Sequence, residues 1–494
     1  MALLRTSLIL GMFFASWQTF AQKTFDFNEN CRSAYEQITM LKLDPGQAIL
    51  NEERKKHPDN LIPYLLDNYI EFFRLFFNEE PELYAGLSKR VGQRLSRIEE
   101  GPHDSPYYLF SKAVINFQSA AVRIKAGGQW EGGWQFRRAY ADIRKNQQAF
   151  PAFGPNLMFS GSMKAAVSII PDGLKWLGNI LGVKGNMDEG IADLEKFLTL
   201  RDDQSLLFRN EAIFYYVLLR YYLRNDKEAI FEFIKAQQPD VKNNHLFTFM
   251  IANLHINYQQ SALTESIINE RNMSPEYLIT PVWDLELGYA RLNHLDDDAP
   301  YYFKRFLAAF KGDYYVKDVL QKLSWHYYIH DDMKQAEYYR SLMRKRKGEN
   351  SEADQLAAKD VERTQWPDKL LLKVRLLNDG GYYHEALGLL HGKRAADFPD
   401  PRLQLEFLYR VARLFNDLDR EEDAMTYFRQ VVAAGKNRKE HYAARAALQL
   451  GMIYEKRKDC RSATAWFNTC LHMKDHDFKN SLDQRAKAGI NRCR

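Results

Sequence analysis

The chain has 494 residues, which is enough for several average domains or for one extended array of repeats. Hydrophobic residues make up 46% and charged residues 27%, as in ordinary soluble proteins, and the net charge of +5 excludes the strong single-sign field typical of nucleic-acid-binding proteins. The aromatic content of 14%, with only 16 prolines, favours long helices over a turn-rich β fold.

Residues 1–21 have the pattern of a cleavable signal peptide. Arg5 supplies a positive charge, residues 8–15 are mostly apolar, and Thr19-Phe20-Ala21 provides a small-x-small cleavage site. The apolar run is much shorter than the roughly 20 residues that span a bilayer, and no cysteine directly follows the site to carry a lipid. No later segment is apolar enough to cross a membrane. We therefore expect an exported, periplasmic protein that begins at Gln22 and is not a lipoprotein.

The remainder of the chain shows helical periodicity almost throughout and predicts an all-α fold. Helix starts are marked by Ser105-Pro106, Pro171-Asp172 and Ser274-Pro275. Residues 22–170 are helical but irregular, and we interpret them as divergent helical hairpins that continue into the more regular residues 171–494. A separate N-terminal helical domain is the alternative.

The stretch 126–145 (AGGQWEGGWQFRRAYADIRK) has two Gly-Gly pairs and two tryptophans. It allows two interpretations, a ligand-binding loop or a turn between two helices. Superposition on residues 380–390 (GGYYHEALGLL) places the first glycine pair in a turn and Gly133 at a small position of the second helix. Phe136 then fits the core only if that helix is shifted by one residue. The alignment favours the turn and leaves open whether Trp134 is exposed.

Small residues recur along the C-terminal half, each on the second helix of a predicted hairpin. Their positions are Gly190, Ala229, Ala299, Ala336, Ala386, Ala424 and Ala463. In the last unit, Leu450-Gly451 and Tyr454 belong to the first helix, and Ala463 and Phe467 belong to the second. This pattern resembles the tetratricopeptide repeat (TPR), a helix–turn–helix unit of about 34 residues whose small residues let two helices cross closely.

The resemblance implies a right-handed α-solenoid of TPR-like hairpins over residues 171–494, closed by a C-terminal capping helix. The wide interval between Ala229 and Ala299 predicts one degenerate hairpin over residues 245–270. The interval before Ala386 contains the charged stretch 344–363, which we interpret as a helix extension or a solvated loop.

A duplicated polar set is the strongest functional signal. Its members are Arg375, Asn378 and Asp379 in the first copy and, 38 residues later, Arg413, Asn416 and Asp417. Counted from the small residues, both copies fall on the helix face that lines the concave groove of TPR proteins, and they resemble the polar ladders that hold peptides there. The neighbouring groove positions are Trp325, Tyr328, Tyr409 and Glu455. Because Arg and Asp one turn apart also form local ion pairs, a purely structural role is the alternative.

Four cysteines lie beyond the signal peptide, and none of their spacings resembles a zinc or thioredoxin motif. Cys460 begins the second helix of the last clear repeat, and Cys493 ends the helix that follows. Because these two helices should pack antiparallel, the two ends should meet. This predicts a Cys460–Cys493 disulfide, with Cys470 buried and Cys31 unpaired. Four reduced thiols are the alternative.

No nucleophile motif, phosphate-binding loop or paired-carboxylate constellation appears, so we expect neither enzymatic activity nor a cofactor. His326 and His330 share one helix face, but two ligands are too few for a structural zinc site. We expect an exported scaffold that binds a protein or peptide partner along its concave groove and does not bind nucleic acid. The alternative is a carbohydrate-binding envelope protein that uses exposed aromatic residues.

Overall fold

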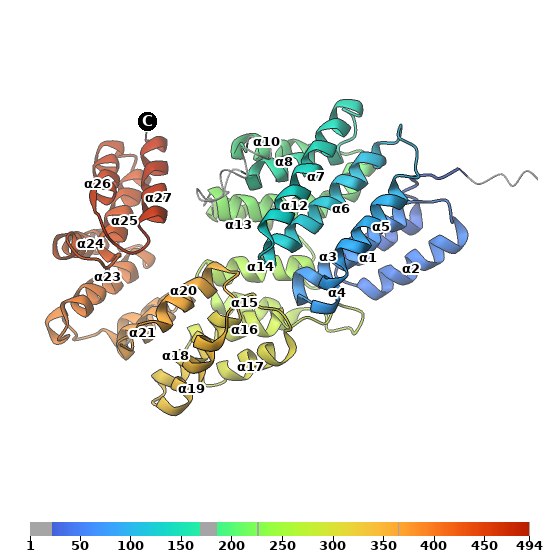
Figure 1. Ribbon diagram of the computed structural model, residues 1–494. Helices are drawn as coiled ribbons and strands as arrows, with labels where there is room; N and C mark the ends of the chain where they lie inside the picture. Colours follow the sequence, from blue (N-terminus) through green and yellow to red (C-terminus); the bar gives the residue numbers. More distant parts are fainter. Residues whose placement is uncertain (1–21, 168–184, 225–226, 364, 494) are drawn as a thin grey trace, which may run out of the picture.

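The computed structural model describes residues 22–167, 185–224, 227–363 and 365–493. Over these residues the chain forms 26 α-helices, most of which pack against the next helix as antiparallel pairs (Figure 1). The all-α prediction is therefore confirmed. The predicted signal peptide lies outside the described residues. Within the described ranges, no helix is both long and apolar enough to cross a bilayer.

The helices of the first half are α1 (Glu29–Thr39), α2 (Leu43–Lys56), α3 (Ile62–Asn78), α4 (Pro81–Ala85), α5 (Leu87–Ile98), α6 (Pro106–Lys125), α7 (Gln129–Ala149), α8 (Pro155–Val167), α10 (Met187–Thr199), α11 (Asp203–Leu207), α12 (Arg209–Leu219) and α13 (Lys227–Gln237). Those of the second half are α14 (His245–Asn257), α15 (Ser261–Glu270), α16 (Val282–Asn293), α17 (Ala299–Ala309), α18 (Val316–Ile329), α19 (Met333–Lys345), α20 (Glu352–Val361), α21 (Lys369–Gly380), α22 (Tyr383–Leu389), α23 (Pro401–Asp417), α24 (Glu421–Gly435), α25 (Tyr442–Lys456), α26 (Cys460–His472) and α27 (Lys479–Arg492).

One of the predicted helix starts is confirmed and one is wrong. Ser105 caps α6 by accepting a hydrogen bond from the Tyr107 backbone N–H, which has no partner within the first turn. Ser274-Pro275 does not start a helix, because α16 begins only at Val282. Tyr277 instead stacks on His245 with ring centroids 3.7 Å apart, and this contact holds the connection in a non-helical path. The third start, Pro171-Asp172, lies outside the described residues.

The apolar residues of the N-terminal half form one continuous core from Phe27 to Leu254. Glu211 of α12 is buried and accepts hydrogen bonds from three tyrosine hydroxyls: Tyr35 of α1 at 2.6 Å, Tyr69 of α3 at 3.0 Å and Tyr215 of α12 at 2.8 Å. Burial raises the pKa of Glu211 because the charged carboxylate loses its water. Helix α12 thus returns to α1 and α3, which are distant in sequence. The predicted boundary at 170/171 adjoins residues that are not described, so it stays a prediction.

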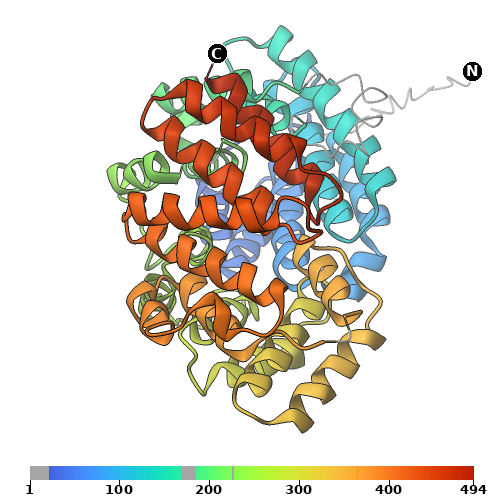
Figure 2. The same cartoon turned by 90° about the vertical axis from the view of Figure 1, so that its left-hand side faces the viewer.

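The core of the second half is divided into smaller clusters that follow one another along the chain. The predicted small residues Gly190, Ala299, Ala336, Ala386, Ala424 and Ala463 are all buried. In the last unit, the fully buried ring of Phe467 lies against Gly451 of α25 and Gly489 of α27, and a Cβ at either glycine would collide with it. The predicted close crossing is therefore confirmed there. Figure 2 shows these C-terminal helices, coloured orange to red, lying one after another across the near face.

The prediction for Ala229 is wrong. Its side chain is exposed, whereas Ile230 and Ile234 of the same helix are buried. The two isoleucines are four residues apart and so share one face of α13, and this larger apolar pair faces the core in place of the small residue.

The two irregular intervals have different outcomes. Residues 245–270 form the pair α14 and α15, which confirms the degenerate hairpin. The stretch 344–363 is neither a helix extension nor a solvated loop, because α19 ends at Lys345 and α20 is a separate helix packed on α18. Asp354 of α20 is fully buried and accepts hydrogen bonds from the backbone N–H groups of Tyr315 (2.8 Å) and Asp318 (3.0 Å). Asp354 is therefore a buried charged residue that caps the start of α18.

The stretch 126–145 contains the predicted turn, followed by a helix. Gly127 has a φ of +86° and ends α6, as expected for a glycine that caps a helix. The second glycine pair lies inside α7, where a Cβ on Gly132 would collide with Ile124 of α6. Gly132, one residue before the predicted Gly133, is therefore a residue of close approach, and Phe136 is buried four residues after it. The shift by one residue is confirmed. Trp134 is 47% exposed, and the guanidinium of its neighbour Arg137 lies 5.5 Å from the ring centroid.

Candidate functional site

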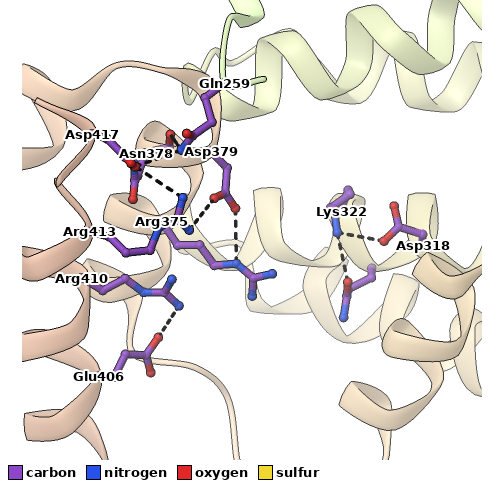
Figure 3. Close-up of polar contacts among 11 residues, drawn as sticks. Gln259, Asp318, Lys322, Arg375, Asn378, Asp379, Glu406, Arg410, Arg413 and Asp417 are labelled. Carbon is purple, nitrogen blue, oxygen red and sulfur yellow. Dashed lines mark hydrogen bonds and ion pairs between the residues drawn. The ribbon is translucent and has the colours of Figure 1, made fainter. Parts of the chain in front are cut away.

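The duplicated polar set lies on α21 and α23, two helices that pack directly against each other. Asp368 and Asp400 cap the starts of these helices through their side chains, which fixes where each helix begins. Figure 3 shows Arg375 of α21 and Arg413 of α23 extending toward the side on which α18 lies. The two arginines predicted from the repeat are therefore brought together.

Two aspartates hold these arginines in place. Asp379 lies between them, 3.6 Å from the Arg375 Nε and 3.4 Å from an Arg413 Nη, and Asp417 lies 3.5 Å from the other Arg413 Nη. Asn378 donates a hydrogen bond to Asp417 at 2.8 Å. Local ion pairs, which were the alternative to ligand binding, are therefore present. Arg375 and Arg413 each pair with an aspartate one turn along their own helix.

The two predicted asparagines donate hydrogen bonds within the protein, and Asn378 is too buried to contact a peptide. Asn378 is 1% exposed, and Asn416 donates a hydrogen bond to the neighbouring Asp417 at 3.2 Å. Both amides therefore orient Asp417, which in turn positions Arg413. Both asparagines thus support an arginine, and peptide binding by the half-buried Asn416 stays a prediction.

Gln259, in the turn between α14 and α15, joins this network from a distant hairpin. Its side-chain amide donates to the Asn378 carbonyl oxygen at 2.8 Å and to Asp417 at 3.2 Å. Its own carbonyl oxygen touches Gly381, whose φ is +90° and which has no room for a Cβ. Only glycine fits this position, because a side chain would meet both the unfavourable φ and the Gln259 carbonyl. The α14–α15 turn thus packs against the end of α21.

The aromatic residues predicted to line an open groove are largely covered. Trp325 is 6% exposed, and its ring is covered by the Lys322 ammonium at 4.4 Å and the Arg375 guanidinium at 5.0 Å. Tyr409 is 2% exposed and packs on Phe428 and Tyr442. The placement of these two rings at an open surface is wrong, because cations and neighbouring rings cover both.

The remaining groove positions are partly accessible and have partners within the protein. Tyr328 is half-buried and stacks on Trp366 with ring centroids 4.5 Å apart. Glu455 forms a two-point ion pair with Arg492 of α27, at 2.6 and 2.9 Å. Of the two predicted arginines, Arg375 is the more accessible, with 43% of its side chain exposed against 20% for Arg413.

Three further arginines were missed by the sequence reasoning. Arg410 of α23 is buried and pairs with Glu406 at 2.7 Å, while Arg445 of α25 and Arg485 of α27 continue the series on the next two odd-numbered helices. Their repeat positions differ from those of Arg375 and Arg413, so alignment of the repeats does not reveal them. Only the packing of α21, α23, α25 and α27 in succession places them in one series.

The candidate metal pair is held by local contacts. The His330 Nδ1–H donates a hydrogen bond to the His326 carbonyl oxygen at 2.8 Å, and the His330 Nε2 lies 3.1 Å from an Asp297 carboxylate oxygen. His326 is buried, and burial together with the neighbouring His330 lowers the pKa of His326 to about 4. Across the described part of the chain, no group of three or more His, Cys, Asp or Glu side chains is arranged to hold a metal ion.

The C-terminal cysteines lie where the sequence predicted. Cys460 is the first residue of α26 and Cys493 directly follows α27, and both are free, half-buried thiols. Desolvation and a hydrogen bond to the Cys460 thiol raise the pKa of Cys493 to about 11. Cys470 is buried, as predicted. The two helix ends therefore meet, and the disulfide itself stays a prediction.

We expect Cys460 and Cys493 to be oxidised when the chain is exported into an oxidising compartment, because their thiols are already in contact. Peptide mapping without reduction should recover the two cysteines in one linked fragment and Cys31 as a free thiol. Alkylation of Cys493 without prior reduction would contradict the bond. The variant Cys470→Ser provides the control, since it should leave the linked fragment unchanged.

No protein-family model matches the chain, and no curated protein matches it either. The paired helices therefore define an all-helical architecture without assigning the chain to a family.

Proposed function

We propose that this protein is an exported, non-enzymatic scaffold whose paired helices form a TPR-like, right-handed α-solenoid and bind a protein partner along its concave face. The succession of helix pairs from α14 to α26, with small residues buried at their crossings, supports the solenoid. The signal-peptide pattern of residues 1–21 supports export to the periplasm. The absence of a catalytic motif in the sequence supports a binding role over an enzymatic one.

One observation carries the binding role. The side chains of Arg375 on α21 and Arg413 on α23 extend to the same side (Figure 3). Their ion pairs with Asp379 and Asp417 are long, at 3.4–3.6 Å. Ion pairs of this length leave guanidinium donors available for a ligand. The carbohydrate alternative depends on exposed rings, and burial of Trp325 and Tyr409 weighs against it.

The test is photo-crosslinking in the exporting cell. Tyr328 is half-buried and lies on α18, three residues after the Trp325 that Arg375 covers. A photoreactive residue in its place should therefore capture a partner only when that partner occupies this face. We expect one dominant crosslinked protein, and we expect the double variant Arg375→Ala, Arg413→Ala to reduce its yield by about tenfold. The measurement is quantitative mass spectrometry of the crosslinked product.

The matched control removes two cations elsewhere. Lys458, in the turn before α26, and Arg461, in the first turn of α26, are both exposed, and the double variant Lys458→Gln, Arg461→Gln should leave the yield unchanged. Equal melting temperatures of the two double variants would show that both fold alike. The same crosslinked product at equal yield from the wild type and from the Arg375, Arg413 variant would contradict the proposal.

A further inference from the structure

Five arginines lie on four C-terminal helices that pack one against the next, and we name them the arginine file. They are Arg375 of α21, Arg410 and Arg413 of α23, Arg445 of α25 and Arg485 of α27. Each of these helices packs against the next one in the series. Figure 3 shows the first three side chains extending the same way from α21 and α23.

The carboxylates near the file do not neutralise it. Arg410 is paired with Glu406, and Arg413 is shared by two aspartates. Arg445 lies 5.6 Å from the ring centroid of Phe478, and Arg485 donates only to the sulfur of Met452, at 3.8 Å. Neither of these two guanidinium groups forms an ion pair within the described residues. Uncompensated positive charge therefore remains at the α25 and α27 end.

Three titratable groups on three different elements experience this excess charge. Burial and the charges of Arg445, Arg410 and Arg375 lower the pKa of His441 to about 2. Burial and the neighbouring Arg445 also lower the pKa of Arg485, and burial and Arg485 lower that of Lys227 on α13. Lys227 belongs to the N-terminal half, and Arg485 and Arg413 of the file are among the positive charges that act on it. An anion between them would relieve this mutual repulsion.

We propose that the arginine file binds an acidic, extended segment of the partner protein. This inference rests on the function proposed above and specifies the chemistry of the partner. Packed helices are spaced by about 8–10 Å, and an extended chain advances by about 3.3 Å per residue. A carboxylate at about every third residue would therefore meet one helix of the file after another. Arg375, Arg445 and Arg485 provide the guanidinium groups, whose planar donors match a carboxylate at two points.

A fluorescent peptide of about 12 residues with glutamate at every third position, separated by serine and glycine, is the probe, since its extended length crosses four packed helices. The comparison peptide carries glutamine in place of each glutamate. We expect the full-length chain to bind the glutamate peptide at least about tenfold more tightly than the glutamine peptide, as measured by fluorescence anisotropy.

The double variant Arg445→Gln, Arg485→Gln should lose about tenfold in affinity, because both guanidinium groups are free of ion pairs. The Lys458→Gln, Arg461→Gln variant loses the same charge outside the file and should bind like the wild type.

Equal affinity of the glutamate and glutamine peptides for the wild type would overturn the inference. So would an unchanged affinity in the Arg445, Arg485 variant with an unchanged melting temperature. Binding of a uronate polysaccharide in place of the glutamate peptide would also overturn it and indicate a carbohydrate ligand. Photo-crosslinking from Tyr328 does not depend on the charge of the partner. An arginine-dependent crosslink without peptide binding would therefore reject the acidic segment and leave the proposed scaffold function in place.

Discussion

Replacing Phe467 by alanine is expected to lower the free energy of unfolding of the C-terminal helices by about 3–5 kcal/mol. The ring is fully buried and fills the space left by the missing side chains of Gly451 and Gly489. Its removal leaves a cavity between three helices that cannot collapse easily, because the two glycines offer no atoms to move into it. The measurement is urea denaturation combined with hydrogen exchange of α25, α26 and α27.

The matched control is Ile279→Ala. Ile279 is 88% exposed, so its truncation should change stability by less than about 0.5 kcal/mol. Because the clusters of the second half are separate, the loss at Phe467 should accelerate exchange in α25–α27 and leave the N-terminal core protected. Uniform loss of protection across the whole chain would contradict the division of the core.

The second large effect is expected at Glu211. Replacement by alanine leaves the hydroxyls of Tyr35, Tyr69 and Tyr215 without their acceptor inside the core. A buried polar group without a partner costs about 1–3 kcal/mol, so three such groups should destabilise the fold by at least about 3 kcal/mol. Glu211→Gln keeps one oxygen as an acceptor and should cost clearly less. Thermal denaturation of the two variants at one pH makes this comparison.

The same carboxyl predicts a pH dependence. Burial raises its pKa in the folded chain above the value of about 4.3 expected for the unfolded chain. Between these two pKa values the folded state binds one more proton than the unfolded state, so the contribution of Glu211 to stability falls as the pH rises through that window and levels off above it. Glu211→Gln should remove this slope. A wild type that gains stability relative to Glu211→Gln over the same pH window would contradict the assignment, and would mean that the three hydroxyls stabilise the charged form.

Whether the sequence predicts a contact of this fold depends on how far apart along the chain the two residues are. The helices and the burial of Ala386, Ala424 and Ala463 follow from local periodicity and from recurring small residues, and both form a regular pattern in the sequence. The predicted burial of Ala229 is wrong because Ile230 and Ile234, on an adjacent face of the same helix, are buried in its place. The contact of Glu211 with Tyr35 joins residues that are 176 positions apart, and no local pattern records it.

The residues of the candidate site also fall into two groups, those that the sequence predicts and those that only the packing reveals. Arg375 and Arg413 are found because the repeat duplicates them at a fixed interval. Arg445 and Arg485 occupy other repeat positions and join the series only through the packing of α25 on α23 and of α27 on α25. The burial of Trp325 is also invisible in the sequence, because Lys322 and Arg375 cover its ring from two different helices.

The contact between Gln259 and Gly381 has a mechanical consequence. It is a touching point between the α14–α15 turn and the end of α21, and α23 to α27 follow from α21 through pairwise packing. This contact therefore sets how closely α21 lies to the α14–α15 turn. A methyl group at Gly381 would collide with the Gln259 carbonyl oxygen and would displace either the turn or the end of α21. The missing side chain of one glycine thus determines how near the whole C-terminal series of helices comes to the α14–α15 hairpin.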